Sequence, residues 1–371
     1  MGSFVLAGGG SGGHVNPLLA TAAELLARGH SVVAVGTREG LESELVPRAG
    51  VELRFVDRVP LPRRPNAAAV TFPRDFSRAT AQATQIIKDA RADAVVGFGG
   101  YVSTPAYRAA RKASVPVVVH EANARPGFAN KYGARFAAAV ATSFAGTELP
   151  GAVVTGLPLR KEISDLASAM ADPSRRSGIA GAAREARGWA ADAPVLLVTG
   201  GSLGAASINA AVSEAAPTLI RHGIHVIHIT GYGKDEGAQR AKGDLPAKLR
   251  DSYHVAEYAH DMAAALSAAS AVLCRAGANT VSEVSALTLP ALYVPLPIGN
   301  GEQALNARSA VDAGAAILIA DGDLTPARVE LEAERMILDS ANAAAMSRAA
   351  ATVGIPNGAA QLADLIEAVA S

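Results

Sequence analysis

Two glycine-rich stretches decide the fold: Gly8-Gly9-Gly10-Ser11-Gly12-Gly13-His14 and, in the second half of the chain, Gly200-Gly201-Ser202-Leu203-Gly204. Each follows an apolar run that is typical of a buried strand, and each precedes an alanine-rich stretch that is typical of a helix. This order forms a phosphate-binding turn, because glycine lets the backbone approach an anion and the helix N-terminus presents N–H groups to it. Two such turns predict two Rossmann-like halves with phosphate chemistry between them.

Short apolar runs alternate with helical stretches along all 371 residues. Runs of this kind are typical of parallel strands that helices cover on both faces. Six runs precede a break at Gly156 and six follow it, which predicts an α/β protein with two parallel-sheet domains. The predicted strands are 4–7, 31–35, 94–97, 116–120, 138–142, 152–155, 195–199, 225–230, 253–256, 271–274, 291–294 and 316–319.

The break between the two sets of strands indicates where the domains meet. It extends from Gly156 to about Asp192 and contains a polar stretch, 172–178, which predicts a flexible hinge. The first domain would span 1–158 and the second 159–356. A turn at 355–358 precedes a last predicted helix, 358–370.

Composition excludes several classes of protein. The formal net charge is +0, which argues against a nucleic-acid partner. The single cysteine, Cys274, follows an apolar run that predicts a buried strand, so it forms no internal disulfide and fits a reducing compartment. Because no apolar run approaches a membrane span and a strand begins almost at once, we expect a cytoplasmic protein without a signal peptide.

The first glycine loop also fits the pattern G-x-G-x-x-G of dinucleotide sites. Such a site needs an acidic residue at the end of the second strand, but the nearest acid, Glu39, comes several residues late. The loop is therefore expected to hold a phosphate or pyrophosphate rather than NAD. His14 follows it and is a candidate general base, since imidazole titrates near neutrality; the alternative is a surface or capping histidine.

Other polar clusters follow predicted strands. A third glycine loop, 97–105, contains Tyr101 and is either a tight turn or part of a site, and His120-Glu121-Ala122-Asn123 ends another strand. Ligands bind at the carboxyl ends of parallel strands, which favours a functional role for these residues.

In the second half, Thr280 and Glu283 have the spacing of a capping box, although Glu283 could instead accept hydrogen bonds from a ribose. The loop 295–303 is either an ordinary loop or a site for sugar hydroxyls, and Asp321-Gly322-Asp323 predicts a turn rather than a metal site.

Together these motifs resemble those of the MurG family, bacterial glycosyltransferases of peptidoglycan synthesis. The resemblance covers nearly the whole chain, in order. The matching stretches are GGGSGGHVNP (8–17), GFGGYVSTPA (97–106), PVVVHEANARPGFANK (116–131), GLPLR (156–160), GGSLGAASIN (200–209), CRAGANTVSE (274–283) and GNGEQALNA (299–307). The resemblance implies the GT-B fold, two Rossmann-like domains facing across a deep cleft, with 357–371 packing back on the first domain. Leu157 and Glu302 depart from the family pattern.

The resemblance also implies roles for individual residues. His14 would be the catalytic base, and Glu121 is the alternative candidate for that role. The acceptor would be held by Gly12, Gly13, His14, Tyr101, His120 and Asn130. The donor would be held by Ser202, Arg160, Asn123, Arg275, Gly277, Thr280, Glu283 and Gln303. No metal and no cofactor is implied.

The implied reaction is an inverting transfer of N-acetylglucosamine from UDP-N-acetylglucosamine to the C4 hydroxyl of lipid I, undecaprenyl-pyrophosphoryl-N-acetylmuramyl-pentapeptide, to form lipid II. Two alternatives remain: a UDP-N-acetylglucosamine 2-epimerase on the same fold, and a non-catalytic nucleotide-sugar-binding scaffold at the membrane. Proteins of cell-wall synthesis and division are candidate partners.

A lipid-linked acceptor implies a peripheral protein on the cytoplasmic face of the cell membrane. The segment Arg63-Arg64-Pro65, followed by 67–74, Phe76 and Arg78, mixes basic and apolar residues. Such a surface can bind anionic lipid. The alternative is an ordinary mobile loop with solvated charges.

Overall fold

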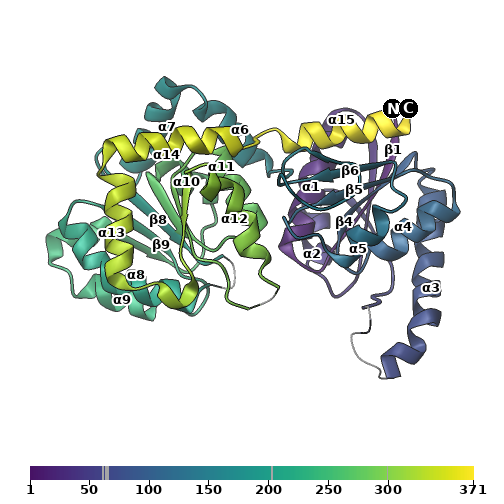
Figure 1. The fold of residues 1–371 in the computed structure, drawn as a ribbon, viewed down its shortest axis with the longest axis horizontal. Helices are drawn as coiled ribbons and strands as arrows, with labels where there is room; N and C mark the ends of the chain where they lie inside the picture. The colour runs from purple at the N-terminus through teal and green to yellow at the C-terminus, as the bar shows by residue number, and fades with distance from the viewer. Residues whose placement is uncertain (61, 63–66, 202–203, 299) are drawn as a thin grey trace. The chain divides into compact units, whose positions relative to one another are not determined.

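The computed structural model describes residues 1–60, 62, 67–201, 204–298 and 300–371. The chain forms two compact units. Met1–Lys161 together with Asn357–Ser371 make the N-terminal unit, and Glu162–Pro356 make the C-terminal unit. Each unit is built on one parallel sheet with helices on its faces (Figure 1). The predicted α/β class with two parallel sheets is confirmed.

The sheet of the N-terminal unit has seven strands in the order β3-β2-β1-β4-β5-β6-β7. All pairings given for it are parallel, and its central strands are buried on both faces, which explains their continuous apolar sequences. The strands are β1 (Ser3–Gly8), β2 (Ser31–Gly36), β3 (Glu52–Phe55), β4 (Ala94–Gly99), β5 (Val117–Glu121), β6 (Ala139–Thr142) and β7 (Ala152–Val154).

Strand β3 is missing from the sequence-based prediction. It lies at the edge of the sheet, where Glu52 and Arg54 are exposed and alternate with partly buried Leu53 and Phe55. A four-residue edge strand with two charged side chains lacks the continuous apolar run that marks the buried strands.

Helices cover both faces of this sheet (Figure 1). One face packs against α1 (Gly12–Ala27), α2 (Glu42–Arg48) and α15 (Gly358–Ala370). The other packs against α3 (Ala67–Asp89) and α4 (Ser103–Lys112), and α5 (Phe128–Gly133) contacts α4. The predicted last helix is present, and its apolar stripe of Leu362, Ala363 and Ile366 is fully buried against this core.

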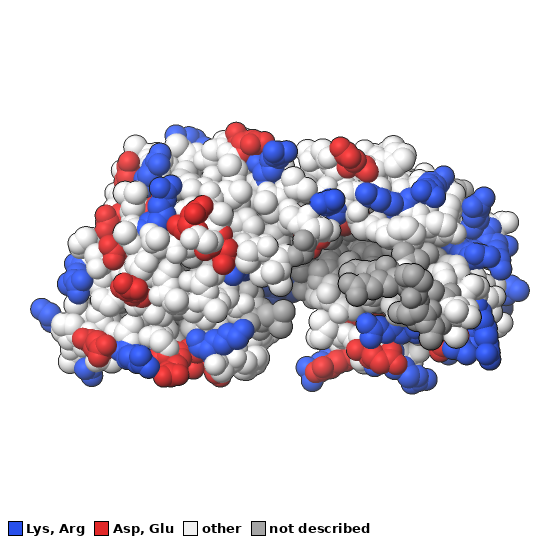
Figure 2. All heavy atoms as spheres, turned by 60° about the horizontal axis from the view of Figure 1, so that its bottom comes forward, with Lys and Arg blue, Asp and Glu red and all other residues white. Residues whose placement is uncertain are grey.

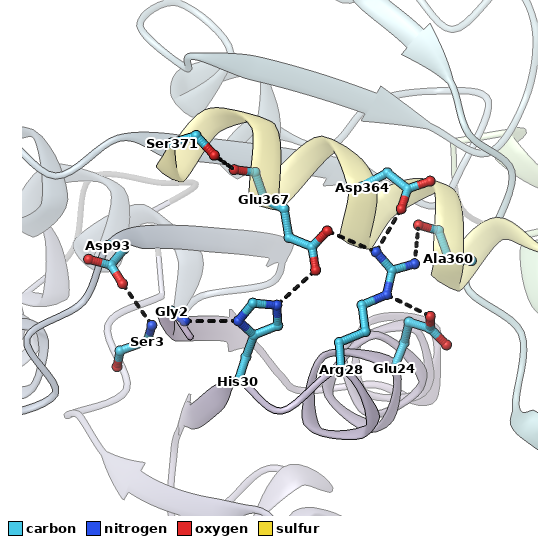
Figure 3. A network of polar contacts seen from close by, with 10 residues as sticks. All are labelled: Gly2, Ser3, Glu24, Arg28, His30, Asp93, Ala360, Asp364, Glu367 and Ser371. Atoms are coloured by element: carbon cyan, nitrogen blue, oxygen red, sulfur yellow. Dashed lines mark hydrogen bonds and ion pairs between the residues drawn. The ribbon is translucent and has the colours of Figure 1, made fainter.

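Polar contacts also hold α15 to the end of α1 (Figure 3). The Arg28 guanidinium donates to Asp364 at 2.6 Å and to Glu367 at 3.0 Å. Glu367 also accepts from Nε2 of His30 at 2.7 Å, while Nδ1 of His30 accepts from the backbone N–H of Gly2. The hydrogen bond from His30 lowers the pKa of Glu367, and the positive charge of Arg28 acts in the same direction. Partial burial of the carboxyl acts in the opposite direction but is outweighed.

The sheet of the C-terminal unit has six parallel strands in the order β10-β9-β8-β11-β12-β13, and all six were predicted. They are β8 (Val195–Thr199), β9 (His225–Ile229), β10 (Tyr253–Ala256), β11 (Ala271–Cys274), β12 (Ala291–Tyr293) and β13 (Ala316–Leu318). Cys274 ends β11 and is fully buried, as predicted, and burial raises the pKa of its thiol.

The helices of this region surround the second sheet. Apolar residues of α8, α13 and α14 share a core with β8 and β11, while α10 packs against α7 and β8. The helices are α6 (Lys161–Met170), α7 (Pro173–Glu185), α8 (Ala206–Arg221), α9 (Glu236–Gly243), α10 (Met262–Ala268), α11 (Ala278–Ala286), α12 (Glu302–Asp312), α13 (Pro326–Ile337) and α14 (Ser340–Val353), with short 3-10 turns η1 (Ala247–Ser252) and η2 (Asp321–Asp323).

The prediction that 172–178 is a flexible polar stretch is wrong, because these residues begin α7 (Pro173–Glu185). Asp172 is the N-cap of α7, its side chain accepts from the Ser174 N–H at 2.8 Å, and Pro173 occupies the first helical turn. Arg176 donates to the carbonyl oxygens of Met170 and Leu287 and so ties this helix to its surroundings. An Asp-Pro pair before a polar stretch is a helix start as readily as a loop.

Among the described residues, none of the helices combines the length and the apolar character that crossing a membrane requires.

Candidate functional site

The topology brings the predicted site segments of each unit to one edge of its sheet. Strands β1, β4 and β5 are neighbours and parallel, so the loops 8–13, 99–102 and 121–127 all follow carboxyl ends on the same side. In the C-terminal unit, β8, β11 and β12 are neighbours, which gathers the segments after Thr199, Cys274 and Tyr293.

A pocket of about 330 Å³ lies at the first of these edges. It contains the glycine loop that leads into α1, together with polar side chains that follow β2, β3 and β4. Its lining residues are Gly9, Gly10, Ser11, His14, Thr37, Glu39, Gly40, Glu42, Arg58, Gly100, Tyr101 and Val102. Two sequence-predicted site residues, His14 and Tyr101, therefore line one cavity.

His14 is half-buried in the first turn of α1. Its Nδ1 lies 3.0 Å from the carbonyl oxygen of Gly9 and 3.2 Å from the hydroxyl of Ser11. Gly99 has a φ of +98°, and a Cβ atom there would lie 3.0 Å from Nε2 of His14. A glycine is thus required beside His14 by both conformation and space.

Glu42, on α2, lines this pocket although it was not predicted from the sequence. It is fully buried, and its carboxylate accepts from Gly10 N–H at 2.8 Å, from Thr37 N–H at 2.8 Å and from the Thr37 hydroxyl at 2.9 Å. A Cβ atom on Gly9, Gly36 or Gly40 would overlap its side chain. Part of the glycine pattern therefore makes room for a carboxylate of the protein, and the Gly10 N–H is already occupied by it.

Tyr101 and Arg58 line the same pocket and lie next to each other. The Tyr101 side chain is exposed, and the Arg58 guanidinium lies 5.3 Å from its ring centroid, which suits a cation–π contact. Arg58 is the positively charged residue among those that line the pocket, so it can attract an anionic ligand. Sequence reasoning missed Arg58 because it follows the unpredicted strand β3.

Glu121 and Asn130 are buried and bonded to the protein. The Glu121 carboxylate accepts from the N–H groups of Asn123 and Gly127 at 2.9 Å and 3.0 Å, and from the Asn130 amide at 2.9 Å. The Asn130 amide also donates to the carbonyl of His120, and its oxygen accepts from Tyr107. These contacts shape the loop after β5, and the proton-accepting oxygens of Glu121 are committed to them.

His120 lies inside the sheet rather than on the surface. It is fully buried, and its Nε2 lies 3.3 Å from the carbonyl oxygen of Gly156. Burial lowers its pKa to about 4, so the ring is neutral. This placement argues against direct contact between His120 and an acceptor.

In the C-terminal unit, the second glycine loop precedes α8. Gly201 and Gly204 have φ values of +80° and +66°, and a Cβ atom on Gly204 would overlap the carbonyl oxygen of Thr230. These positions require glycine. The predicted donor residue Ser202 lies outside the described residues.

Arg275 braces the loops after β11 and β12. Its guanidinium donates to the carbonyl oxygens of Val294 and Pro295 at 3.1 Å, to Ser207 at 3.1 Å, and to the carboxylate of Asp321. Burial opposes ionisation of Asp321, but hydrogen bonds from Ser207 and Arg275 lower its pKa. Asp321 begins the 3-10 turn η2, so the predicted turn at 321–323 is present.

The predicted capping box at Thr280 is wrong. The N-cap of α11 is Gly277, whose φ of −65° and ψ of 147° are extended, and Thr280 lies inside the helix. Glu283 is half-buried in the following turn. Because Thr280 is not the N-cap, the capping-box alternative for Glu283 is wrong, and its contact with a ribose stays a prediction.

The remaining predicted donor residues lie at the ends of other elements. Gln303 is half-buried in the first turn of α12, and its side-chain oxygen accepts from the Leu296 N–H at 2.9 Å. Gly301, with a φ of +76°, caps that helix. Arg160 is half-buried directly before α6, and Asn123 is half-buried after β5. Among the described residues, no group of His, Cys, Asp and Glu is arranged to hold a metal ion.

Comparison with known proteins defines the class first. Residues 4–142 match the glycosyltransferase family 28 N-terminal domain, and residues 195–362 match the glycosyltransferase family 28 C-terminal domain. The crystal structure of Acinetobacter baumannii MurG is 31% identical with a TM-score of 0.77, covering 98% of this chain and 99% of that one. The fold is therefore GT-B, as predicted.

A relative from Clavibacter sepedonicus, named UDP-N-acetylglucosamine--N-acetylmuramyl-(pentapeptide) pyrophosphoryl-undecaprenol N-acetylglucosamine transferase, is 49% identical over 99% of this chain and 97% of its own. The chain belongs to glycosyltransferase family 28 and, within it, to the MurG group. A Listeria monocytogenes structure described as a UDP-N-acetylglucosamine 2-epimerase is 14% identical with a TM-score of 0.68, covering 99% of this chain and 96% of that one, a likeness of fold alone.

Proposed function

We propose that this chain transfers N-acetylglucosamine from UDP-N-acetylglucosamine to lipid I and so forms lipid II. The observation that carries the proposal is the 49% identity to a transferase of this name over 99% of the chain. The epimerase alternative has only fold-level likeness behind it, at 14% identity.

The donor is assigned to the C-terminal unit. Arg275 holds the loops after β11 and β12 together, and the N-terminus of α8 follows the second glycine loop. A helix N-terminus stabilises the negative charge that develops on a departing UDP. Glu283 would accept hydrogen bonds from the ribose, and Gln303 would contact the sugar.

The acceptor is assigned to the pocket of the N-terminal unit. Arg58 would attract the pyrophosphate or a carboxylate of the pentapeptide, and Tyr101 offers an exposed ring. His14 would remove the proton from the C4 hydroxyl as its oxygen attacks the anomeric carbon. The bond from that carbon to the UDP oxygen breaks, UDP leaves with the electron pair, and the configuration inverts to a β-1,4 linkage.

His14 is preferred to Glu121 as the base. His14 lines the pocket, whereas Glu121 is buried and already accepts three hydrogen bonds. A positioned base contributes about 10²–10⁴-fold to such a reaction.

Peripheral attachment to the cytoplasmic face of the membrane completes the proposal, because the lipid tail of the acceptor stays in the bilayer. On α3, Val70 is 82% exposed and Arg74 is exposed. Figure 2 shows Lys and Arg gathered at the right-hand edge of the view, on the unit that carries α3 and α4. Arg78 instead pairs with Asp57 at 2.5 Å, and residues 63–66 lie outside the described part of the chain.

The reaction is tested with radiolabelled UDP-N-acetylglucosamine and a short-chain lipid I analogue. We expect a disaccharide-lipid product that forms only when both substrates are present. Conversion of the nucleotide sugar without an acceptor would support the epimerase, and donor binding without turnover would support the scaffold.

A further inference from the structure

One peptide group links the buried Glu42 to His14. The peptide between Gly9 and Gly10 donates its N–H to Oε2 of Glu42 at 2.8 Å, and its carbonyl oxygen lies 3.0 Å from Nδ1 of His14. The carboxylate and the imidazole therefore contact the two ends of the same planar dipole.

This contact favours one tautomer of the His14 imidazole. A carbonyl oxygen can only accept, so a hydrogen bond between Gly9 and His14 forms only in the tautomer with the hydrogen on Nδ1. The Ser11 hydroxyl, 3.2 Å from the same nitrogen, can accept as well. Nε2 is then the nitrogen with a free lone pair, on the side where a Cβ atom at Gly99 would lie 3.0 Å away.

We propose that Glu42 is a positioning residue that acts on His14 through the Gly9–Gly10 peptide. It holds the imidazole with Nδ1 protonated and strengthens Nε2 as the proton acceptor. The inference rests on the proposed function in one respect, the assignment of His14 as base. The physical reason is that hydrogen bonds in a chain polarise one another, and a charge on the N–H side makes the carbonyl a stronger acceptor. The arrangement performs the role of the carboxylate in a Ser-His-Asp triad, with a peptide group inserted.

The surroundings of Glu42 explain why a carboxylate is needed. Its three polar neighbours, the N–H groups of Gly10 and Thr37 and the Thr37 hydroxyl, all donate. A glutamine would turn an NH₂ group toward one of the backbone N–H groups, where neither can accept. Gly36 and Gly40 leave no space for the side chain to move away.

The other charged and titratable groups around His14 come from neighbouring loops. Glu39, Arg58 and Tyr101 line the same pocket, and Glu121 lies on β5 with its oxygens bonded to other residues. The carboxylates of α15 pair with Arg28 and His30 at the other end of α1. Among these groups, Glu42 is the one connected to His14 through a peptide.

The first test is the tautomer of His14 in the full-length wild-type protein. Histidine is labelled with ¹⁵N, and His14→Gln identifies its resonances. Above the pH at which His14 is charged, we expect the Nδ1-protonated form. Predominance of the Nε2-protonated form would overturn the proposal, whatever the variants do.

The second test compares Glu42→Gln with Val46→Ala on a soluble, short-chain acceptor. Val46 is fully buried one turn further along α2, so its truncation perturbs the same helix without touching the carboxylate. We expect Glu42→Gln to lower kcat about 10- to 100-fold, the size of effect typical when a residue that orients a functional histidine is lost. The acidic limb of its pH–rate profile should move to lower pH, because a negative charge that favours the imidazolium is gone. Val46→Ala should keep the wild-type profile.

A folded Glu42→Gln protein with the wild-type kcat and acidic limb would refute the relay. If the Glu42→Gln variant does not fold, the tautomer of His14 measured in the wild-type protein still tests the proposal. The proposed function fails separately, in the wild type, if no transfer to the acceptor occurs. If transfer occurs and His14→Ala keeps it, the base assignment fails and the catalytic role of Glu42 fails with it.

Discussion

The attachment of α15 gives a stability prediction whose size follows from the contacts. Glu367→Gln removes one charge-assisted hydrogen bond from Arg28 at 3.0 Å but leaves an amide oxygen to accept from His30. Buried, a hydrogen bond to a charged group contributes about 1.5–3 kcal/mol. The Glu367 side chain is 34% exposed, and exposed ion pairs contribute only about 0.2–1 kcal/mol. We therefore expect a loss of about 1 kcal/mol.

The pH dependence of this loss follows from the lowered pKa of Glu367. A carboxyl whose pKa is lower in the folded than in the unfolded protein adds stability above its unfolded pKa. That stability is lost as the pH falls through the folded pKa. The difference between wild type and Glu367→Gln should therefore be full at pH 7 and shrink in the acid range below about pH 4.

Thermal and urea unfolding of both proteins at several pH values measure this. A loss of about 1 kcal/mol corresponds to a shift in Tm of about 2–4 °C for a unit of this size. Asp364→Asn is the matched control, because Asp364 is 69% exposed and pairs with the same arginine. If Glu367→Gln is no less stable than that control, or if its deficit is unchanged in acid, the reasoning is wrong.

Three further predictions concern function. His14→Ala should suppress transfer while the affinity for UDP-N-acetylglucosamine, measured by calorimetry, stays near wild type; an equal loss of donor binding would make His14 a donor ligand. Glu283→Ala should weaken UDP binding by about 1.5–3 kcal/mol with little change in thermal stability, since α11 is capped at Gly277; the reverse result would restore a structural role. Replacing Arg63, Arg64 and Arg74 with Ser should weaken salt-sensitive sedimentation with anionic liposomes, at about 1 kcal/mol for each charge near the surface, and spare activity on a soluble acceptor. Unchanged sedimentation at low salt would exclude this face.

The fold could be predicted because its signals are local. The apolar runs of β4 and β8 are buried on both faces, so every position along them is apolar or glycine or a small polar residue. The last helix was predicted from the turn that precedes it, and its apolar stripe is buried in the core. Such elements can be predicted from their own residues alone, because burial selects apolar residue types wherever they occur.

Errors arose where the same residues fit two local structures. Asp172-Pro173 begins a helix, although the polar stretch after it is typical of a loop. Thr280 has the spacing of a cap, but Gly277 ends the preceding segment three residues earlier. Packing against the rest of the unit selects between such alternatives, and that information is not in the local sequence.

For the candidate site, the sequence by itself determined which loops lie together, because loops that follow neighbouring strands of a parallel sheet share one edge. Only the tertiary structure decided what each side chain does there. In the structure, His120 is buried and the oxygens of Glu121 accept hydrogen bonds from neighbouring residues. Glu42 accepts a hydrogen bond from the first glycine loop. Helix α1, strand β2 and a turn separate Glu42 from Gly10 along the chain, and their hydrogen bond depends on how α2 packs against the sheet. A contact of that kind is set by three-dimensional packing, which no spacing along the chain encodes.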